Sequence, residues 1–140
     1  MIAMKNIFVY GSLMFEEVWG QLTHNQYHKM DAHLKGFIRL TVKGEEYPGI
    51  IPSPDNQVTG HLYINVCSDD IEQLDSFEGE LYQRSQVIVL SDGSEYKADT
   101  YIFKSKYQTL LSGKEWDAGL FKEKGLKNFL KKYGYFNQQQ

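Results

Sequence analysis

The sequence predicts a single domain of the α+β class, with about six strands and two or three helices. The chain has 140 residues, the usual length of one domain. Short runs of continuous or alternating apolar residues, typical of strands, recur along the chain as far as residue 103. Other segments repeat apolar residues at helical spacing. We expect the domain to span residues 1–136 and residues 137–140 to form a disordered tail.

The first half of the chain is predicted to be mainly strands. Residues 6–10 form an apolar, β-branched and aromatic run that ends at Gly11, as a buried strand does. A short helix is predicted over residues 15–22, where apolar residues recur at helical spacing. Further strands are predicted over residues 34–42, 47–51 and 58–66, and the last alternates apolar with polar residues.

The second half begins with a helix and a hairpin. Ser68 is expected to cap the helix, two carboxylates follow in its first turn, and Gly79 is expected to end it. Strands over residues 81–90 and 95–103 are joined through an Asp-Gly pair, a strong hairpin signal. A C-terminal helix is predicted over residues 116–132.

The charge balance argues against a general nucleic-acid-binding protein. Asp and Glu number 18 and Lys and Arg 15, giving a formal net charge of −3 and a pI near 5.8. A nucleic-acid-binding domain normally carries a basic excess. The lysines between residues 122 and 132 are expected to form the solvated face of the C-terminal helix, and contact with nucleic acid or a membrane is the alternative.

The cellular setting expected is the cytoplasm. A single cysteine, Cys67, excludes an internal disulfide and a cysteine-cluster zinc site. No stretch reaches the roughly 20 apolar residues that a membrane-spanning helix needs, and the N-terminal residues lack the pattern of a signal peptide. We therefore expect no membrane partner. The sequence leaves the oligomeric state open.

Glu78 is the candidate catalytic residue. At about 100° per residue, it projects roughly 20° from Ile71 and roughly 40° from Leu74, in the apolar stripe of its helix. A carboxylate aimed at a core costs several kcal/mol unless it is paired or protonated. The helix C-terminus also raises its pKa, and enzymes prepare a general acid/base in this way. In the alternative, the helix frays before Gly79 and Glu78 points into solvent or pairs with Arg84.

The candidate binding segment is the turn Tyr10, Gly11, Ser12 and Leu13, where a buried strand runs into glycine just before a helix. Such a turn can present consecutive backbone N–H groups to an anion, and glycine permits close approach. A plain turn is the alternative.

Several other residues are weaker candidates for a site. Cys67 precedes a helix but has no recognisable Cys/His signature around it, so a buried small side chain is the favoured interpretation. His24 and His28 are spaced to share a helix face, yet no third metal ligand is evident. Tyr47 and Arg39 can reach a cavity or simply pack in strands.

Three short motifs in order carry a resemblance to a known family. They are Phe-Val-Tyr-Gly-Ser-Leu at residues 8–13, Leu-Asp-Ser-Phe-Glu-Gly at residues 74–79 and Tyr-Gln-Arg at residues 82–84. With Lys-Gly-Phe, Tyr-Pro-Gly-Ile and Val-Thr-Gly between them, this set resembles the gamma-glutamylcyclotransferase-like superfamily, in its avirulence-induced-protein-like branch. The resemblance spans roughly residues 6–103.

The resemblance implies a compact, mixed-strand, barrel-like core with flanking helices around one polar cavity. It implies an acyltransferase or lyase type of reaction, in which the α-amine of a small γ-glutamyl substrate attacks the γ-carbonyl and releases 5-oxoproline and an amine or amino acid. No cofactor and no metal are implied. Glu78 falls on the catalytic glutamate, residues 10–13 fall on the substrate-binding loop, and Tyr82 matches a tyrosine that lines the pocket or orients Glu78. A non-catalytic binding or interaction domain on the same fold is the alternative.

Overall fold

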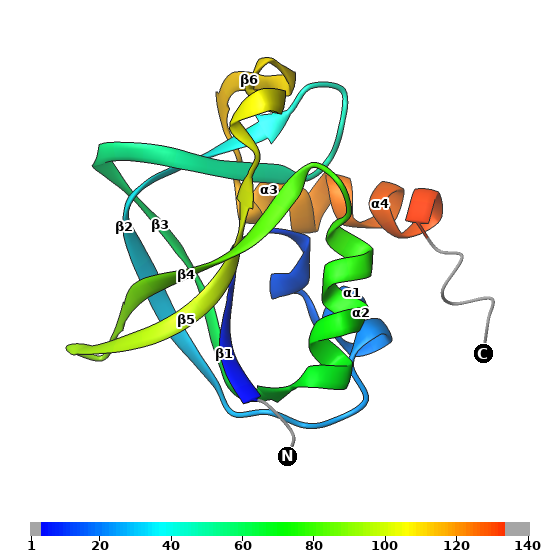
Figure 1. Ribbon diagram of the computed structural model, residues 1–140. Coiled ribbons are helices and arrows are strands. Elements are labelled where there is room, and N and C mark those ends of the chain that lie inside the picture. The colour runs from blue at the N-terminus through cyan, green and yellow to red at the C-terminus, as the bar shows by residue number, and fades with distance from the viewer. Residues whose placement is uncertain (1–3, 134–140) are drawn as a thin grey trace.

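The computed structural model describes residues 4–133, so the tail predicted for residues 137–140 lies outside the described part. The strands are β1 (Met4–Val9), β2 (Lys29–Val42), β3 (Pro48–Cys67), β4 (Tyr82–Ser91), β5 (Ser94–Phe103) and β6 (Leu111–Glu115). They lie in the order β3-β1-β5-β4-β2-β6, and β2 also pairs with β3. The sheet therefore closes on itself into a barrel-like ring (Figure 1), which confirms the predicted α+β class.

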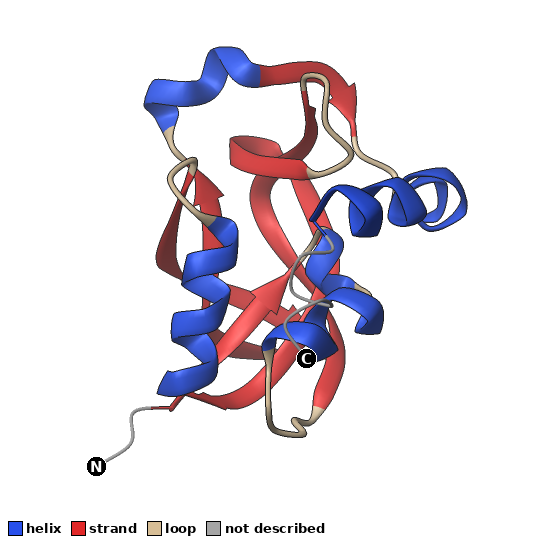
Figure 2. Ribbon diagram, turned by 90° about the vertical axis from the view of Figure 1, so that its right-hand side faces the viewer, coloured by secondary structure: helices blue, strands red, loops and turns tan. Residues whose placement is uncertain are grey.

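The α-helices gather on one side of this ring (Figure 1). They are α1 (Glu16–Leu22), α2 (Ser68–Glu78), α3 (Ala118–Leu120) and α4 (Leu126–Tyr133), with 3₁₀ turns η1 (Ser12–Met14) and η2 (Ser105–Leu110) and a π-helical turn η3 (Phe121–Gly125). Seen from that side, the α-helices lie in front of the strands (Figure 2). No helix within residues 4–133 is both long enough and apolar enough to cross a membrane.

β1 connects the two apolar cores of the fold. Its successive side chains alternate between opposite faces of the sheet, as in any strand. Ile7 and Val9 belong to the core that packs against the helices, whereas Phe8 and the following Tyr10 belong to a second core formed with other strands of the ring. Because β1 is buried along this stretch, the turn that follows it is held firmly in place.

One long strand replaces two predicted ones. Residues 47–51 and 58–66 were predicted as separate strands, but β3 runs through both. In the sequence, the prolines within this stretch indicate a break between two strands. In the structure they fall where the β2–β3 register shifts, between the pairs Phe37↔Pro52 and Lys35↔Gln57, so their missing N–H groups are tolerated at an irregular part of the ladder.

The hairpin is confirmed and the boundaries of α2 are partly corrected. β4 and β5 pair from Tyr82↔Phe103 to Ser91↔Ser94, with φ of 50° at Asp92 and 79° at Gly93. α2 ends before Gly79 as predicted, and Gly79 adopts a φ of 77° that favours glycine. Its N-terminal cap, however, is Cys67 and not Ser68, and no side chain caps this end of the helix.

The C-terminal region departs most from the prediction. A continuous helix was expected over residues 116–132, but helix begins only at Ala118, where the Asp117 side chain accepts a hydrogen bond of 2.9 Å from the Leu120 N–H. The π-helical turn η3 then separates α3 from α4. Strand β6 was not predicted, because its sequence Leu-Ser-Gly-Lys-Glu lacks apolar alternation. The lysines from residue 122 to residue 132 are exposed, as predicted.

Candidate active site

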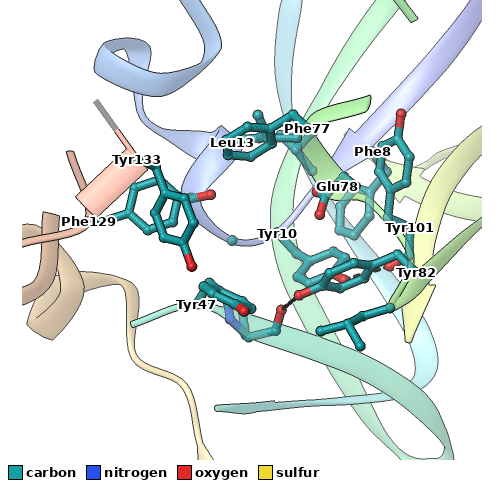
Figure 3. Close-up of a pocket in the computed structure, with 15 residues that line it drawn as sticks. Phe8, Tyr10, Leu13, Tyr47, Phe77, Glu78, Tyr82, Tyr101, Phe129 and Tyr133 are labelled. Atoms are coloured by element: carbon teal, nitrogen blue, oxygen red, sulfur yellow. Dashed lines mark hydrogen bonds between the residues drawn. The ribbon is translucent and has the colours of Figure 1, made fainter. Parts of the chain in front are cut away.

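A cavity of about 330 Å³ opens between the end of β1, the C-terminal end of α2, the starts of β3 and β4, and α4 (Figure 3). All of the residues predicted as site residues line it: Tyr10, Gly11, Ser12, Leu13, Glu78 and Tyr82. The turn that holds four of these residues lies far in the sequence from Glu78 and Tyr82, which are close to each other in the chain. Their convergence is what makes this cavity the candidate active site.

The turn after β1 brings consecutive backbone N–H groups to the lining of the cavity. Its own hydrogen bonds run from the Met14 N–H to the Gly11 carbonyl (2.9 Å) and from the Phe15 N–H to the Ser12 carbonyl (3.1 Å). The N–H groups of Gly11, Ser12 and Leu13 come earlier in the chain and are the donors of neither bond. Three consecutive donors of this kind are suited to binding a carboxylate or an oxyanion.

The position of this turn depends on a close approach at Gly11. A Cβ atom at Gly11 would lie 2.9 Å from Cδ of Pro48, so a side chain there would force the turn or β3 to move. Arg39 holds the turn from the other side, because its Nη1 donates to the Tyr10 carbonyl at 2.8 Å and to the Thr59 carbonyl at 3.0 Å. Arg39 does not itself line the cavity, whereas Tyr47 does.

Glu78 is the last residue of α2, and its side chain lines the cavity. The residue is half-buried because the cavity is open, yet its carboxyl is surrounded closely enough that burial is the main influence on it. Burial, with the nearby Asp75 carboxylate as a second cause, raises the pKa of Glu78 to about 8. No hydrogen bond from residues 4–133 offsets this rise in pKa.

Arg84 is not the partner of Glu78, so the alternative of a Glu78–Arg84 ion pair is wrong. The Arg84 Nε lies 2.9 Å from Asp75 Oδ1, and its Nη1 lies 2.5 Å from Asp99 Oδ2. Asp75 also accepts a hydrogen bond of 2.7 Å from the hydroxyl of Tyr101, a residue that lines the cavity. In this network the negative charge of Asp75 lies near Glu78. The guanidinium of Arg84 is already paired with Asp75 and Asp99.

Tyr82 contributes a wall of the cavity. Its ring meets Phe103 edge to face, with 5.3 Å between the ring centroids. Its hydroxyl donates to the Pro48 carbonyl at 2.7 Å and so is not directed to Glu78. Burial, followed by the negative charge of Glu78, raises the pKa of the Tyr82 hydroxyl. Of the two roles that the resemblance implied, the geometry supports lining the pocket.

Sequence reasoning missed much of the aromatic lining. Phe8, Phe77, Tyr101, Phe129 and Tyr133 also face the cavity. Aromatic residues make up 14% of the chain, a content that favours an aromatic-walled pocket. It does not say which rings converge, because that depends on how distant segments pack.

The other candidates lie away from the cavity. His24 and His28 were placed on a helix face, but they follow the end of α1 and lie in the segment before β2. Within residues 4–133 no group of three or more His, Cys, Asp or Glu residues is arranged to hold a metal ion. The sulfur of Cys67 accepts hydrogen bonds from Tyr27 (3.2 Å) and Asn25 (3.5 Å).

The sequence and the fold have counterparts among known proteins. The family model described as "Gamma-glutamyl cyclotransferase, AIG2-like" matches residues 7–118. AIG2-like protein D of Arabidopsis thaliana is 35% identical over 133 residues, which cover 93% of this chain and 87% of that protein. The chain therefore belongs to the AIG2-like gamma-glutamyl cyclotransferase family.

Solved structures agree with this family. The solution structure of an Arabidopsis thaliana protein matches with a TM-score of 0.72 at 31% identity, covering 93% of this chain and 88% of that one. A structure titled "Gamma-glutamyl cyclotransferase" matches with a TM-score of 0.62 at 20% identity, covering 73% of this chain and 68% of that one. The second match shows a shared fold.

Proposed function

We propose that this protein is a γ-glutamyl cyclotransferase acting on a small γ-glutamyl amide, with Glu78 as general acid/base. The observation that carries the proposal is a carboxyl whose pKa of about 8 lies close to neutral pH, set in the same cavity as the turn formed by residues 10–13. A general acid/base works best when its pKa is near the working pH. The family supports the same class of reaction.

The reaction balances without any co-reactant. The α-amine nitrogen of the glutamyl group forms a bond to its own γ-carbonyl carbon, and the bond from that carbon to the leaving nitrogen breaks. The Glu78 carboxylate takes the proton from the attacking nitrogen and returns it to the leaving nitrogen. The products are 5-oxoproline and a free amine. Much of the barrier is lowered by holding the substrate folded for attack.

The turn after β1 supplies the binding half of this mechanism. The N–H groups of Gly11, Ser12 and Leu13 would hold the glutamyl α-carboxylate or the oxyanion that develops on the attacked carbonyl. Tyr82 would form part of the wall against which the substrate folds. Glu78 lines the same cavity as the turn, which supports its proposed action on a substrate anchored there.

The proposal is tested by a mass-spectrometric assay for 5-oxoproline over a panel of γ-glutamyl amines, γ-glutamyl amino acids and glutathione. Wild type should form product, and Glu78→Gln, which keeps the size of the side chain, should be slower by about a hundredfold or more. Glu72→Gln, an exposed change on the same helix, is the matched control and should retain activity. Normal turnover by Glu78→Gln would refute the role of Glu78. If no substrate in the panel gives product, the proposal of an enzyme is refuted in favour of the alternative, a non-catalytic binding domain.

A further inference from the structure

Arg39 brings a positive charge to the turn after β1 from outside the cavity. Its Nη1 donates to the Tyr10 carbonyl at 2.8 Å and to the Thr59 carbonyl at 3.0 Å. Its Cζ atom lies 5.2 Å from the centroid of the buried Trp116 ring, a distance at which the ring attracts a cation. The guanidinium is therefore held at several points, although it does not line the cavity.

Within residues 4–133, no carboxylate lies at ion-pair distance from this guanidinium. The ion pairs formed there involve other cations. The carboxylates of Asp117 and Glu115 act on Arg39 from farther away. Burial lowers the pKa of Arg39, but the ordinary value for arginine is so high that the side chain stays charged. A half-buried cation bound by neutral carbonyls keeps an unbalanced positive field around it.

The Tyr10–Gly11 peptide unit links this charge to the cavity. The peptide bond is trans, so the Gly11 N–H points away from the Tyr10 carbonyl that Arg39 binds. Gly11 lines the cavity, whereas Arg39 does not. A charge-assisted hydrogen bond to a carbonyl polarises the peptide and makes its N–H a stronger donor. Arg39 is thereby placed to strengthen a hydrogen bond from the Gly11 N–H without touching the acceptor.

The described lining of the cavity provides no positive charge of its own. Among residues 4–133, those that line the cavity include no Lys, Arg or His. A carboxylate that leaves water for such a place is strongly disfavoured unless donors or a positive field compensate it. Of the two anions considered for the turn, the glutamyl α-carboxylate carries its full charge as soon as it binds, whereas the oxyanion develops only during the reaction. The α-carboxylate therefore gains most from a nearby cation.

From the hydrogen bond between Arg39 and the Tyr10 carbonyl, and from the lack of a cation among the described lining residues, we infer that Arg39 is a positioning residue that makes the turn selective for a carboxylate. This role rests on the proposed function, which places the glutamyl head at the turn. The guanidinium orients the Tyr10–Gly11 peptide, and its charge strengthens the hydrogen bond from the Gly11 N–H to the glutamyl α-carboxylate.

The first test uses wild type and two ligands of similar size that differ in charge. 5-Oxoproline keeps the α-carboxylate, and its carboxamide is neutral. Calorimetric titration should show 5-oxoproline binding about tenfold more tightly than the carboxamide, or ~1.4 kcal/mol. Equal affinities, or no binding of 5-oxoproline, would overturn the inference.

Two variants separate the charge of Arg39 from its packing. Arg39→Gln keeps an N–H donor but removes the charge, so it should weaken binding of 5-oxoproline about tenfold and that of the carboxamide less than about twofold. A single nitrogen of Arg39 makes both hydrogen bonds, so the ammonium in Arg39→Lys can replace it, and this variant should stay within about threefold of wild type. Lys35→Gln removes an exposed cation from the same strand, β2, and is the matched control that should change neither affinity.

Two results with these variants would contradict a role for the charge. Equal losses for the two ligands in Arg39→Gln would show that Arg39 only supports the structure of the turn. An affinity for 5-oxoproline as weak in Arg39→Lys as in Arg39→Gln would show that restoring the positive charge does not restore binding. Either result overturns the inference.

Steady-state kinetics distinguish failure of this inference from failure of the proposed function. The carboxylate is bound equally before and during ring closure, so Arg39→Gln should raise KM for a γ-glutamyl substrate about tenfold and change kcat less than about twofold. A loss of kcat at unchanged KM would overturn the inference and leave the reaction standing. If the binding of 5-oxoproline depends on Arg39 as expected but wild type forms no 5-oxoproline from any γ-glutamyl substrate, the proposed reaction fails and the carboxylate-selective turn stands.

Discussion

Burial of Glu78 should make the protein less stable as the pH rises. Its pKa is about 8 in the folded protein, against an ordinary value of 4.5, so the folded state binds this proton more tightly than the unfolded state does. The resulting stabilisation is complete below pH 4.5 and is lost progressively as the pH rises through about 8. Each pH unit in this window is worth about 1.4 kcal/mol, which sets an upper limit of about 5 kcal/mol.

Glu78→Gln removes this dependence on pH. Gln resembles the protonated form of Glu in size, so the variant should match wild type at about pH 5 and exceed it by about 2–5 kcal/mol at about pH 9. Urea unfolding followed by tryptophan fluorescence gives the free energy of unfolding at each pH. Glu72→Gln controls for the removal of a charge from the same helix. A stability difference between Glu78→Gln and wild type that stays constant over this range would refute the reasoning.

Two further changes test the surroundings of Glu78 and the turn. Asp75→Asn removes the carboxylate that helps to raise the pKa of Glu78, so the rising limb of kcat/KM against pH should move to lower pH; an unmoved limb would contradict this. Gly11→Val places side-chain atoms where a Cβ alone would lie 2.9 Å from Pro48, and should weaken calorimetric binding of 5-oxoproline about tenfold. Gly113→Val, where a Cβ meets nothing within 4 Å, serves as its control, and unchanged affinity in folded Gly11→Val would count against the turn as the carboxylate site.

Local signals in the sequence predicted the features that local physics controls. The tight turn between β4 and β5 requires positive φ values, and Asp92 and Gly93 adopt them. Gly79 likewise adopts a positive φ where α2 ends. The helical angle that placed Glu78 on the apolar stripe correctly predicted a side chain that faces the interior. Each of these depends on residues within a few positions of one another, so a single sequence contains the information.

Features that depend on distant packing were not predicted. Pro52 falls in β3 at a register shift that only the partner strand β2 defines. β6 lacks apolar alternation and forms because it pairs with β2, as at Leu40↔Glu115. Phe129 and Tyr133 reach the cavity only because the chain after β6 returns to α2 and β3. No pattern near these residues distinguishes a ring that lines a cavity from one that fills a core.

The acidic residues of α2 differ in the hydrogen-bond donors that surround their carboxyl groups. Asp70 is only 1% exposed, yet it accepts hydrogen bonds from the Tyr27 hydroxyl (2.7 Å), the Asn25 amide (3.2 Å) and the His24 N–H (3.1 Å). Burial opposes ionisation, but these donors together lower the pKa of Asp70 below its ordinary value. Asp70 thereby joins the segment before β2 to the helix as a stable anion.

Asp75 and Glu78 lie further along α2, within one turn of each other, and differ in their hydrogen-bond donors. Asp75 is bound by Arg84 and by the Tyr101 hydroxyl, so its oxygen atoms are already engaged. Glu78 faces the cavity with burial and the Asp75 charge both raising its pKa, and no donor among residues 4–133 counters them. A group can carry a proton between two nitrogen atoms only if it holds that proton weakly enough to release it and is free to approach both. Of these acidic residues on α2, only Glu78 has that freedom, because the donors nearby are committed to the other two.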